Sequence, residues 1–203
     1  MRWFYFLKIW KKIKLLKQLQ KQLKGELKLD ETTLILYSTD ASAYRQRPIA
    51  VFIPENDCID DIKLLLDFCK KHNTFLIPRA AGTSLAGQVV GAGIVVDVSK
   101  NLNQILEVNA QEKWVRVQAG VVLQQLNQYL KPYNLLFGPE TSTANRCCIA
   151  GMVGNNSCGL HSLVYGSTRD HLLEAKVILA DGKQVLLKQY SEEEFSAKAQ
   201  QED

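Results

Sequence analysis

The sequence predicts an α+β (α/β) fold in which short strands alternate with amphipathic helices around one core. Strand-like runs of β-branched and aromatic residues are separated by segments whose apolar residues recur every three or four positions. The 203 residues are 46% hydrophobic and 23% charged, which suffices for one sizeable core and excludes disordered and fibrous classes. Two glycine-rich segments interrupt this pattern, and they carry the functional prediction.

Seven short strands are expected, each a run of β-forming residues between turn-forming ones. The last two, 175–179 and 185–187, flank Asp181-Gly182, a dipeptide typical of a hairpin turn. The first five lie at 49–53, 74–77, 94–98, 105–109 and 114–118.

Two helices are expected between the strands. The first follows Asp57, a suitable amino-terminal cap, and ends at His72-Asn73. Its apolar residues share one face: Ile59, Ile62, Leu65, Leu66 and Cys69. The second helix is marked by Leu123, Leu126 and Leu130 and stops at Pro132, because proline lacks the N–H that a helix interior needs.

Residues 1–24 predict a separate, basic amphipathic helix. Two placements stay open: its apolar stripe docks on the body of the protein, or it makes peripheral contact with an anionic membrane surface. The chain thus divides into this helix (1–24), a central domain (25–190) and a polar tail (191–203). The apolar stripe consists of Trp3, Phe4, Phe6, Leu7, Trp10, Ile13, Leu16, Leu19 and Leu23.

Charge and cysteine content exclude several functions. Of the 25 basic and 21 acidic residues, nine and one fall within 1–28, which leaves sixteen and twenty, a net charge of −4, for 29–203. This balance argues against nucleic acid as a partner. The five cysteines have no C-x-x-C spacing, and no metal site is expected. Without an apolar run long enough to span a membrane, the chain is expected to be cytoplasmic, with any membrane contact peripheral and on the inner face.

The first glycine-rich segment, Pro78 to Gln88, directly follows a predicted strand. Its residues are mostly small, so successive backbone N–H groups can face one concavity, which suits a phosphate. Thr83 and Ser84 can add hydroxyl donors, whereas Arg79 is interpreted first as an orienting or surface residue. The glycine spacing fits neither a Walker loop, a Rossmann turn nor a nucleophile elbow. A tight turn that merely connects two strands is the alternative.

The second glycine-rich segment, 138–166, is dominated by Gly, Ala, Ser, Thr and Asn. It is too long for an ordinary connection. Small side chains would let a planar ligand lie against backbone, while Asn and Ser groups offer hydrogen-bond donors to a polar ring edge. This segment is therefore expected to line a binding site.

Together these segments resemble the FAD-binding domain of vanillyl-alcohol oxidase and p-cresol methylhydroxylase flavoproteins. Within this class the chain is most similar to the FAD-linked 2-hydroxyacid dehydrogenases: glycolate oxidase of the GlcD type, D-lactate dehydrogenase and D-2-hydroxyglutarate dehydrogenase. The resemblance covers residues 25–188 and is strongest to the long variant that also carries iron–sulfur modules. It rests on YSTDASAYRQRP (37–48), PRAAGTSLAGQ (78–88), GPETSTANRCCIAGMVGNNSCG (138–159) and YGSTRDH (165–171).

The resemblance implies two small α/β subdomains with the flavin between them. The first segment lacks the His that some relatives bond covalently to flavin, so FAD is expected to be non-covalent. The pyrophosphate would contact Arg79, Ala80, Ala81, Gly82, Thr83 and Ser84, although many members have Gly at the positions of Ala80 and Ala81. The rest of the cofactor would lie near Gln88, Pro139, Thr141, Ala150, Gly151, Asn155, Gly159, Tyr165 and Gly166.

The activity that the resemblance implies is oxidation of a D-2-hydroxyacid, of the lactate, glycolate or 2-hydroxyglutarate type, by hydride transfer to flavin N5. No residue here is expected to be catalytic, because His161 is interpreted as structural and Cys147, Cys148 and Cys158 as packing residues. In the family a following domain holds the substrate. The fold is therefore expected to be incomplete at its carboxyl end and the chain inactive by itself. The alternative is a truncated, non-catalytic remnant or interaction module that keeps the fold without binding flavin.

Overall fold

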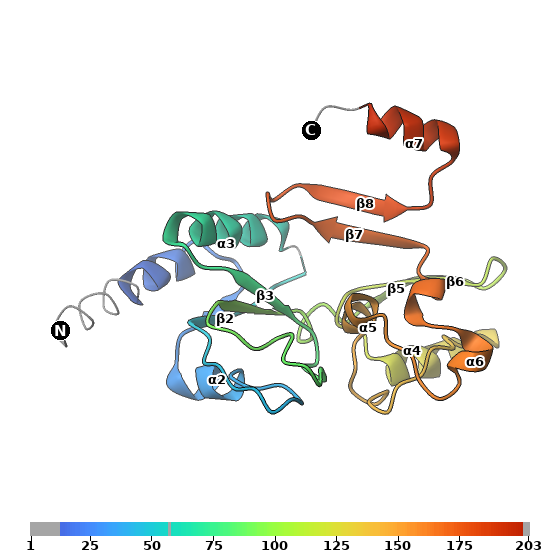
Figure 1. Cartoon of the computed structure of the whole chain (residues 1–203), viewed down its shortest axis with the longest axis horizontal. Helices are drawn as coiled ribbons and strands as arrows, with labels where there is room; N and C mark the ends of the chain where they lie inside the picture. Colours follow the sequence, from blue (N-terminus) through green and yellow to red (C-terminus); the bar gives the residue numbers. More distant parts are fainter. Residues whose placement is uncertain (1–12, 57, 201–203) are drawn as a thin grey trace.

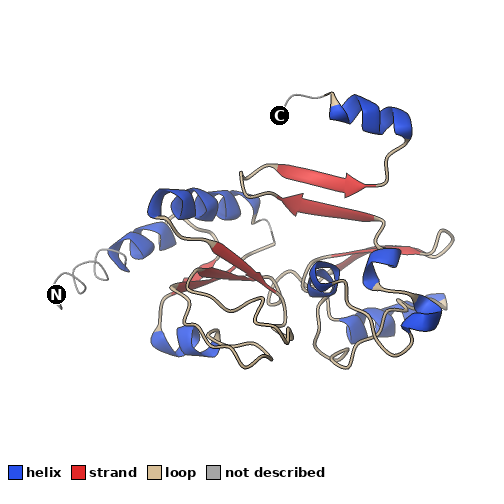
Figure 2. Ribbon diagram, viewed as in Figure 1, coloured by secondary structure: helices blue, strands red, loops and turns tan. Residues whose placement is uncertain are grey.

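Two subdomains lie side by side in the computed structural model, with a carboxyl-terminal hairpin above them (Figure 1). The structure describes residues 13–56 and 58–200. Helices and strands are interleaved in both subdomains (Figure 2), which confirms the predicted α+β class.

The first subdomain is built on a four-stranded sheet with the order β1-β2-β4-β3. β1 (Glu26–Lys28) pairs antiparallel with β2 (Ala50–Ile53), whereas β2 and β3 (Leu76–Arg79) both run parallel to β4 (Ile94–Asp97). The strands predicted at 49–53, 74–77 and 94–98 are confirmed. However, β3 begins two residues later than predicted and extends through Arg79 into the first glycine-rich segment.

The two faces of this sheet are covered by different helices. Phe52 and Ile94 pack on one face against α3 (Ile59–His72) and the helical residues 13–20. Val51 and Val95 pack on the other face with Leu34 of α2 (Glu31–Leu36). In Figure 1, α3 and α2 accordingly lie on opposite sides of the sheet. Neither β1 nor α2 was expected from the sequence, because both are too short to show a periodic pattern.

The amino-terminal helix is docked over the part that the structure describes. Leu16 and Leu19 are only 3% and 5% exposed and belong to the core of the first subdomain. The connection to β1 is fixed by buried Asp61, whose carboxylate accepts the backbone N–H groups of Lys24 and Gly25. Residues 1–12 lie outside the described residues, so the proposed membrane contact of this helix stays a prediction, as does its boundary at residue 24.

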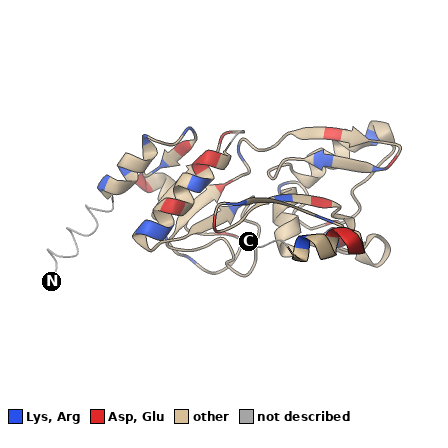
Figure 3. Cartoon of the chain, turned by 90° about the horizontal axis from the view of Figure 1, so that it is seen from above, with Lys and Arg blue, Asp and Glu red and all other residues tan. Residues whose placement is uncertain are grey.

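The helix α3 is confirmed with its predicted end at His72 and Asn73. Asn73 closes it in the left-handed conformation at φ 49°. Asp60 and Asp61 occupy its first turn and Lys70 and Lys71 its last, the arrangement that complements a helix dipole. Figure 3 shows acidic and basic side chains interspersed along it. The predicted cap, Asp57, lies outside the described residues.

The second subdomain begins with the antiparallel pair β5 (Ile105–Asn109) and β6 (Trp114–Val117), as predicted. The helix α4 (Leu123–Leu130) follows, and a 3₁₀ turn, η1 (Lys131–Tyr133), takes over at Pro132. Leu126 and Leu130 pack with Val121 against the strand pair. None of the described helices is both long and apolar enough to cross a membrane.

The prediction that 138–166 is one continuous loop is wrong. It contains α5 (Ile149–Asn155) and α6 (Ser162–Tyr165), and the 3₁₀ turn η2 (Thr168–His171) follows. Gly151 and Gly154 lower the helix propensity of α5. Tertiary packing outweighs this deficit, since Met152 is 1% exposed in a cluster with Leu123 and Cys147.

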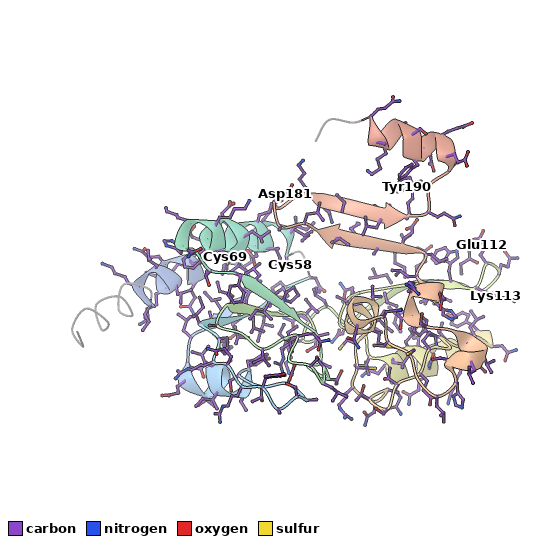
Figure 4. The ribbon with its side chains drawn as sticks, in the orientation of Figure 1. Cys58, Cys69, Glu112, Lys113, Asp181 and Tyr190 are labelled. Carbon is purple, nitrogen blue, oxygen red and sulfur yellow. The ribbon has the colours of Figure 1, made fainter. Side chains whose placement is uncertain are left out.

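The last elements form the predicted hairpin, β7 (Glu174–Ile178) and β8 (Gln184–Lys188), followed by α7 (Glu192–Ala199). The hairpin is tied to β6 by an ion pair of 3.5 Å between Arg116 Nη2 and Glu174 Oε2. The polar tail is partly helical, because Ser191 and Glu194 form a capping box. Tyr190, labelled in Figure 4 between β8 and α7, donates its hydroxyl to the Leu186 carbonyl oxygen at 3.0 Å.

Candidate functional site

The first glycine-rich segment leaves β3 and turns sharply at two glycines. Gly82 has φ +68° and Gly87 has φ +75°, values that residues with a Cβ atom rarely adopt. Ala80, Ala81, Thr83 and Ser84 are half-buried, so their backbone is accessible at one side. The Ser84 hydroxyl accepts the Ala86 N–H at 3.3 Å and therefore stabilises the loop itself. The segment is an ordered loop of small residues rather than a minimal connection between strands.

Arg79 lies behind this loop as an orienting residue. Its Nη1 donates to the Thr39 carbonyl oxygen at 2.8 Å, and its guanidinium lies 5.2 Å from the centre of the Tyr37 ring. The same group packs against Gly82, where a Cβ atom would come within 2.4 Å of Arg79 Nη2. Glycine at position 82 thus serves two needs, the positive φ and the space that Arg79 occupies.

A second segment, residues 37–46, supports the loop from outside. The Ala41 N–H donates to the Gly82 carbonyl oxygen at 3.2 Å. The ring of Tyr44 packs on Gly87, where a Cβ atom would lie 2.7 Å from Tyr44 Cδ2. These contacts assign a structural role to part of the YSTDASAYRQRP motif. The motif was used for the resemblance, but its residues were given no function by the sequence reasoning.

The helix α5 of the second subdomain runs beside the loop of the first. At its amino end, a Cβ atom on Gly151 would lie 3.2 Å from the Cβ atom of Ala80. At its carboxyl end, Gln88 Nε2 donates to Asn155 Oδ1 at 3.1 Å. The helix is held in place because the N–H of Ala150 donates to the Ala119 carbonyl oxygen at 3.1 Å. The two glycine-rich segments therefore meet at the junction of the subdomains.

A groove of about 720 Å³ lies within the second subdomain. Pro139, Thr141 and Tyr165 line it, together with the apolar side chains of Leu123 and Phe137. The chain around it is tightly packed. Gly138 lies under the Tyr165 ring, and a Cβ atom on Gly159 would come within 2.0 Å of the Glu140 carbonyl oxygen.

The predicted cofactor residues therefore fall into separate groups. Ala80, Gln88, Gly151 and Asn155 meet at the subdomain junction, with Gly82 in the turn next to it, whereas Pro139, Thr141 and Tyr165 line the groove. Gly166 has a different role in the chain. Its φ of +72° ends α6, and a Cβ atom there would lie 2.8 Å from Asp170 Oδ2.

The histidine and cysteine predictions have mixed outcomes. His161 Nδ1 pairs with Glu140 Oε2 at the edge of the groove, and both side chains are about half exposed. Cys147 and Cys148 are buried, as expected of packing residues. Burial raises the pKa of the Cys148 thiol to about 11, while the backbone of Ala81 acts in the opposite direction. Cys158 is exposed, so its interpretation as a packing residue is wrong.

The junction fits a bound dinucleotide cofactor in three respects. The loop residues are small, the facing helix presents Gly151 beside Ala80, and a guanidinium lies directly behind the turn. Within the described residues, no group of three or more His, Cys, Asp or Glu side chains could hold a metal ion. The arrangement suits an anionic group against backbone N–H groups and a planar group along the small residues.

Proteins with a related sequence are FAD-linked enzymes by name. The chain is 41% identical over 163 residues to D-2-hydroxyglutarate dehydrogenase of Pseudomonas putida, covering 80% of this chain and 16% of that protein. It is 33% identical over 165 residues to glycolate oxidase subunit GlcD of Bacillus subtilis, covering 79% of this chain and 35% of that protein. The chain thus spans between about a sixth and about a third of the length of these two relatives.

Solved structures share the fold. The Physcomitrella patens BBE-like 1 protein superposes with a TM-score of 0.72 at 20% identity, covering 85% of this chain and 37% of that one. An alkyldihydroxyacetonephosphate synthase gives a TM-score of 0.68 at 18% identity, covering 81% of this chain and 32% of that one. Residues 48–188 match the model of the family described as FAD binding domain. This match covers more than half of the sequence, and the chain belongs to the FAD-binding domain family.

Proposed function

We propose that this chain is the FAD-binding part of a flavoprotein dehydrogenase that oxidises a D-2-hydroxyacid to a 2-oxoacid. Relatives named D-2-hydroxyglutarate dehydrogenase and glycolate oxidase subunit GlcD support this substrate class. A third relative, the mitochondrial D-lactate dehydrogenase of Kluyveromyces lactis, is 33% identical over 158 residues, covering 76% of this chain and 27% of that protein. Lactate, glycolate and 2-hydroxyglutarate share a carboxylate next to the carbinol carbon, so the reaction is the same for each.

The observation that carries the proposal is the meeting of the two glycine-rich segments at Ala80–Gly151 and Gln88–Asn155. Segments separated by some seventy residues come together with small side chains facing each other. In this proposal the backbone around Gly82 binds the pyrophosphate and α5 lies along the adjoining part of the cofactor. FAD supplies the hydride acceptor when bound, and its attachment is non-covalent.

The second group of residues completes the proposed site. Pro139, Thr141 and Tyr165 line a groove close to α5, since Thr141 Oγ1 lies 3.2 Å from the Sγ atom of Cys147, two residues before that helix. These residues exclude water from one side of a planar ring. Binding and orienting the hydroxyacid is assigned to residues outside this chain, because the proposed site has no base paired with a carboxylate anchor. We place the protein in the cytoplasm.

The test is FAD binding by the purified chain and by Gly82→Asp, followed through flavin fluorescence. The wild-type chain is expected to bind FAD, whereas Gly82→Asp is expected to lose binding, because it puts a carboxylate beside Arg79 and next to the phosphates. Gly182→Asp is the matched control. Gly182 also has a positive φ, +89°, but lies in the β7–β8 turn.

The interaction-module alternative predicts a different result. A folded chain that stays colourless and does not quench flavin fluorescence would support that alternative. Equal FAD affinity of the wild type and Gly82→Asp would remove the first loop from the site. Circular dichroism of each protein establishes that it is folded before binding is compared.

A further inference from the structure

Arg79 and Asp97 occupy opposite positions on neighbouring strands. They are register partners in the parallel pair β3–β4. Both follow, by two residues, side chains buried on the same face, Ile77 and Val95, so both point to that face. In the part of the chain that the structure describes, Arg79 nevertheless takes part in no salt bridge.

Tyr37 satisfies Asp97 in place of the arginine. Its hydroxyl donates to Asp97 Oδ2 at 2.5 Å, while the other carboxylate oxygen accepts from Ser99 N at 2.8 Å and Ser99 Oγ at 2.6 Å. Asp97 is only 3% exposed, so these donors are what offset its desolvation. The pKa of Tyr37 is raised, first by burial and then by this hydrogen bond, which keeps the hydroxyl protonated as a donor.

The guanidinium is consequently left without a carboxylate partner. One nitrogen donates to the Thr39 carbonyl oxygen, one face lies over the Tyr37 ring, and one edge packs against Gly82. A neutral carbonyl and an aromatic ring orient the cation without cancelling its charge. An uncompensated positive charge therefore lies directly behind the turn of the glycine-rich loop.

We propose that Tyr37 is a positioning residue of the FAD site, whose hydroxyl holds Asp97 away from Arg79 and so keeps the arginine charge available to the pyrophosphate. The inference rests on the proposed function and adds the source of the charge at that site. Tyr37 itself does not touch the cofactor. Without its hydroxyl, Asp97 Oδ2 becomes a buried acceptor with no donor, and the arginine on the next strand is its nearest replacement.

The experiment compares the affinity of six full-length proteins for FAD and for inorganic pyrophosphate, measured by isothermal titration calorimetry. Tyr37→Phe removes one oxygen atom and is expected to weaken both ligands about tenfold, and Arg79→Met by at least as much. Adding Asp97→Asn to Tyr37→Phe is expected to restore the wild-type affinity, because no carboxylate remains to neutralise Arg79. Tyr190→Phe and Arg116→Met, in the hairpin and on β6, are matched controls that should bind like the wild type.

Restoration by Asp97→Asn is the readout that a purely structural role would not produce, since a second change in a weakened core would lower the affinity further. Wild-type affinity in Tyr37→Phe, or a double variant no better than Tyr37→Phe, overturns the inference and leaves the proposed function standing. A wild-type chain that binds neither ligand overturns the proposed function, and the inference with it. Should Tyr37→Phe unfold, wild-type affinity in Arg79→Met overturns the inference equally.

Discussion

At the scale of single residues, Gly82, Arg79 and Tyr37 form a chain of dependence. Gly82 is required by its positive φ and by the guanidinium packed against it. Arg79 is in turn oriented by Thr39 and Tyr37. The glycine and the arginine were evident from the sequence, because they stand in one motif. Tyr37 and Asp97 were not, because 60 residues separate them and no local pattern reports such a contact.

The raised pKa of Tyr37 predicts a pH dependence of stability. A pKa that is higher in the folded than in the unfolded chain gives stability that is present below about pH 10 and lost as the pH rises toward the folded value. The free energy of unfolding of the wild type should therefore exceed that of Tyr37→Phe near neutral pH, with the difference shrinking in alkali. Urea titrations of both proteins at pH 7 and above pH 10 measure this difference; one that stays constant would count against the Tyr37–Asp97 hydrogen bond.

Cysteine reactivity offers a second prediction at this scale. Cys158 is exposed, whereas Cys148 is buried and its raised pKa, about 11, keeps it a thiol at neutral pH. A thiol reagent at pH 8 should modify Cys158 well before Cys148 in the folded chain. Peptide mapping after brief labelling identifies the modified sites, and Cys158→Ser should remove that early labelling. Early modification of Cys148 would show that α5 does not cover it as described.

At the scale of elements, α5 shows where sequence patterns fail. A stretch with two glycines and two asparagines within nine residues has the composition of a loop, yet burial of Met152 makes it a helix. The longer elements α3 and α4 and the strands of the first subdomain could be predicted, because their apolar periodicity extends over enough residues. Short elements such as β1 and α2 exist only through tertiary contacts, and local sequence carries no comparable signal for them.

The two glycines of α5 should respond differently to alanine. A Cβ atom on Gly154 would meet nothing within 4 Å, whereas one on Gly151 would press on Ala80 at 3.2 Å. Gly154→Ala should therefore raise the free energy of unfolding by about 0.5–1 kcal/mol, the usual gain in helix propensity. Gly151→Ala should gain less and should weaken FAD binding. Chemical denaturation and flavin titration of the two variants compare them directly, and equal behaviour would mean that the loop does not approach α5.

Docking of the amino-terminal helix gives a further prediction. Leu16 and Leu19 pack with Phe68 and Cys69 of α3 in the first core. Leu16→Ala should lower the free energy of unfolding by roughly 2–5 kcal/mol, the range for a buried leucine. Ile13→Ala is the control, because Ile13 lies on the same helix but is 42% exposed. An equal and small loss in both variants would show that the helix is not part of the core.

At the scale of the whole molecule, the account depends on two subdomains that meet along α5 and the first glycine-rich loop. The hairpin β7–β8 completes the matched family region, which ends at residue 188. The division into subdomains could be expected from the resemblance, and similar solved structures confirm the fold. How the two segments interlock could not be deduced from composition, because it depends on particular contacts such as Gln88–Asn155 and Ala80–Gly151.

The most direct measurement is a map of backbone amide chemical shifts in the ¹⁵N-labelled chain during titration with FAD. The account predicts saturable changes at residues 80–84 and at Gly151 and Asn155, with residues 184–188 of β8 unaffected. ADP, which shares the pyrophosphate but not the flavin, should shift the first loop. Saturating FAD that leaves residues 80–84 unchanged would contradict the assignment of this loop to the cofactor.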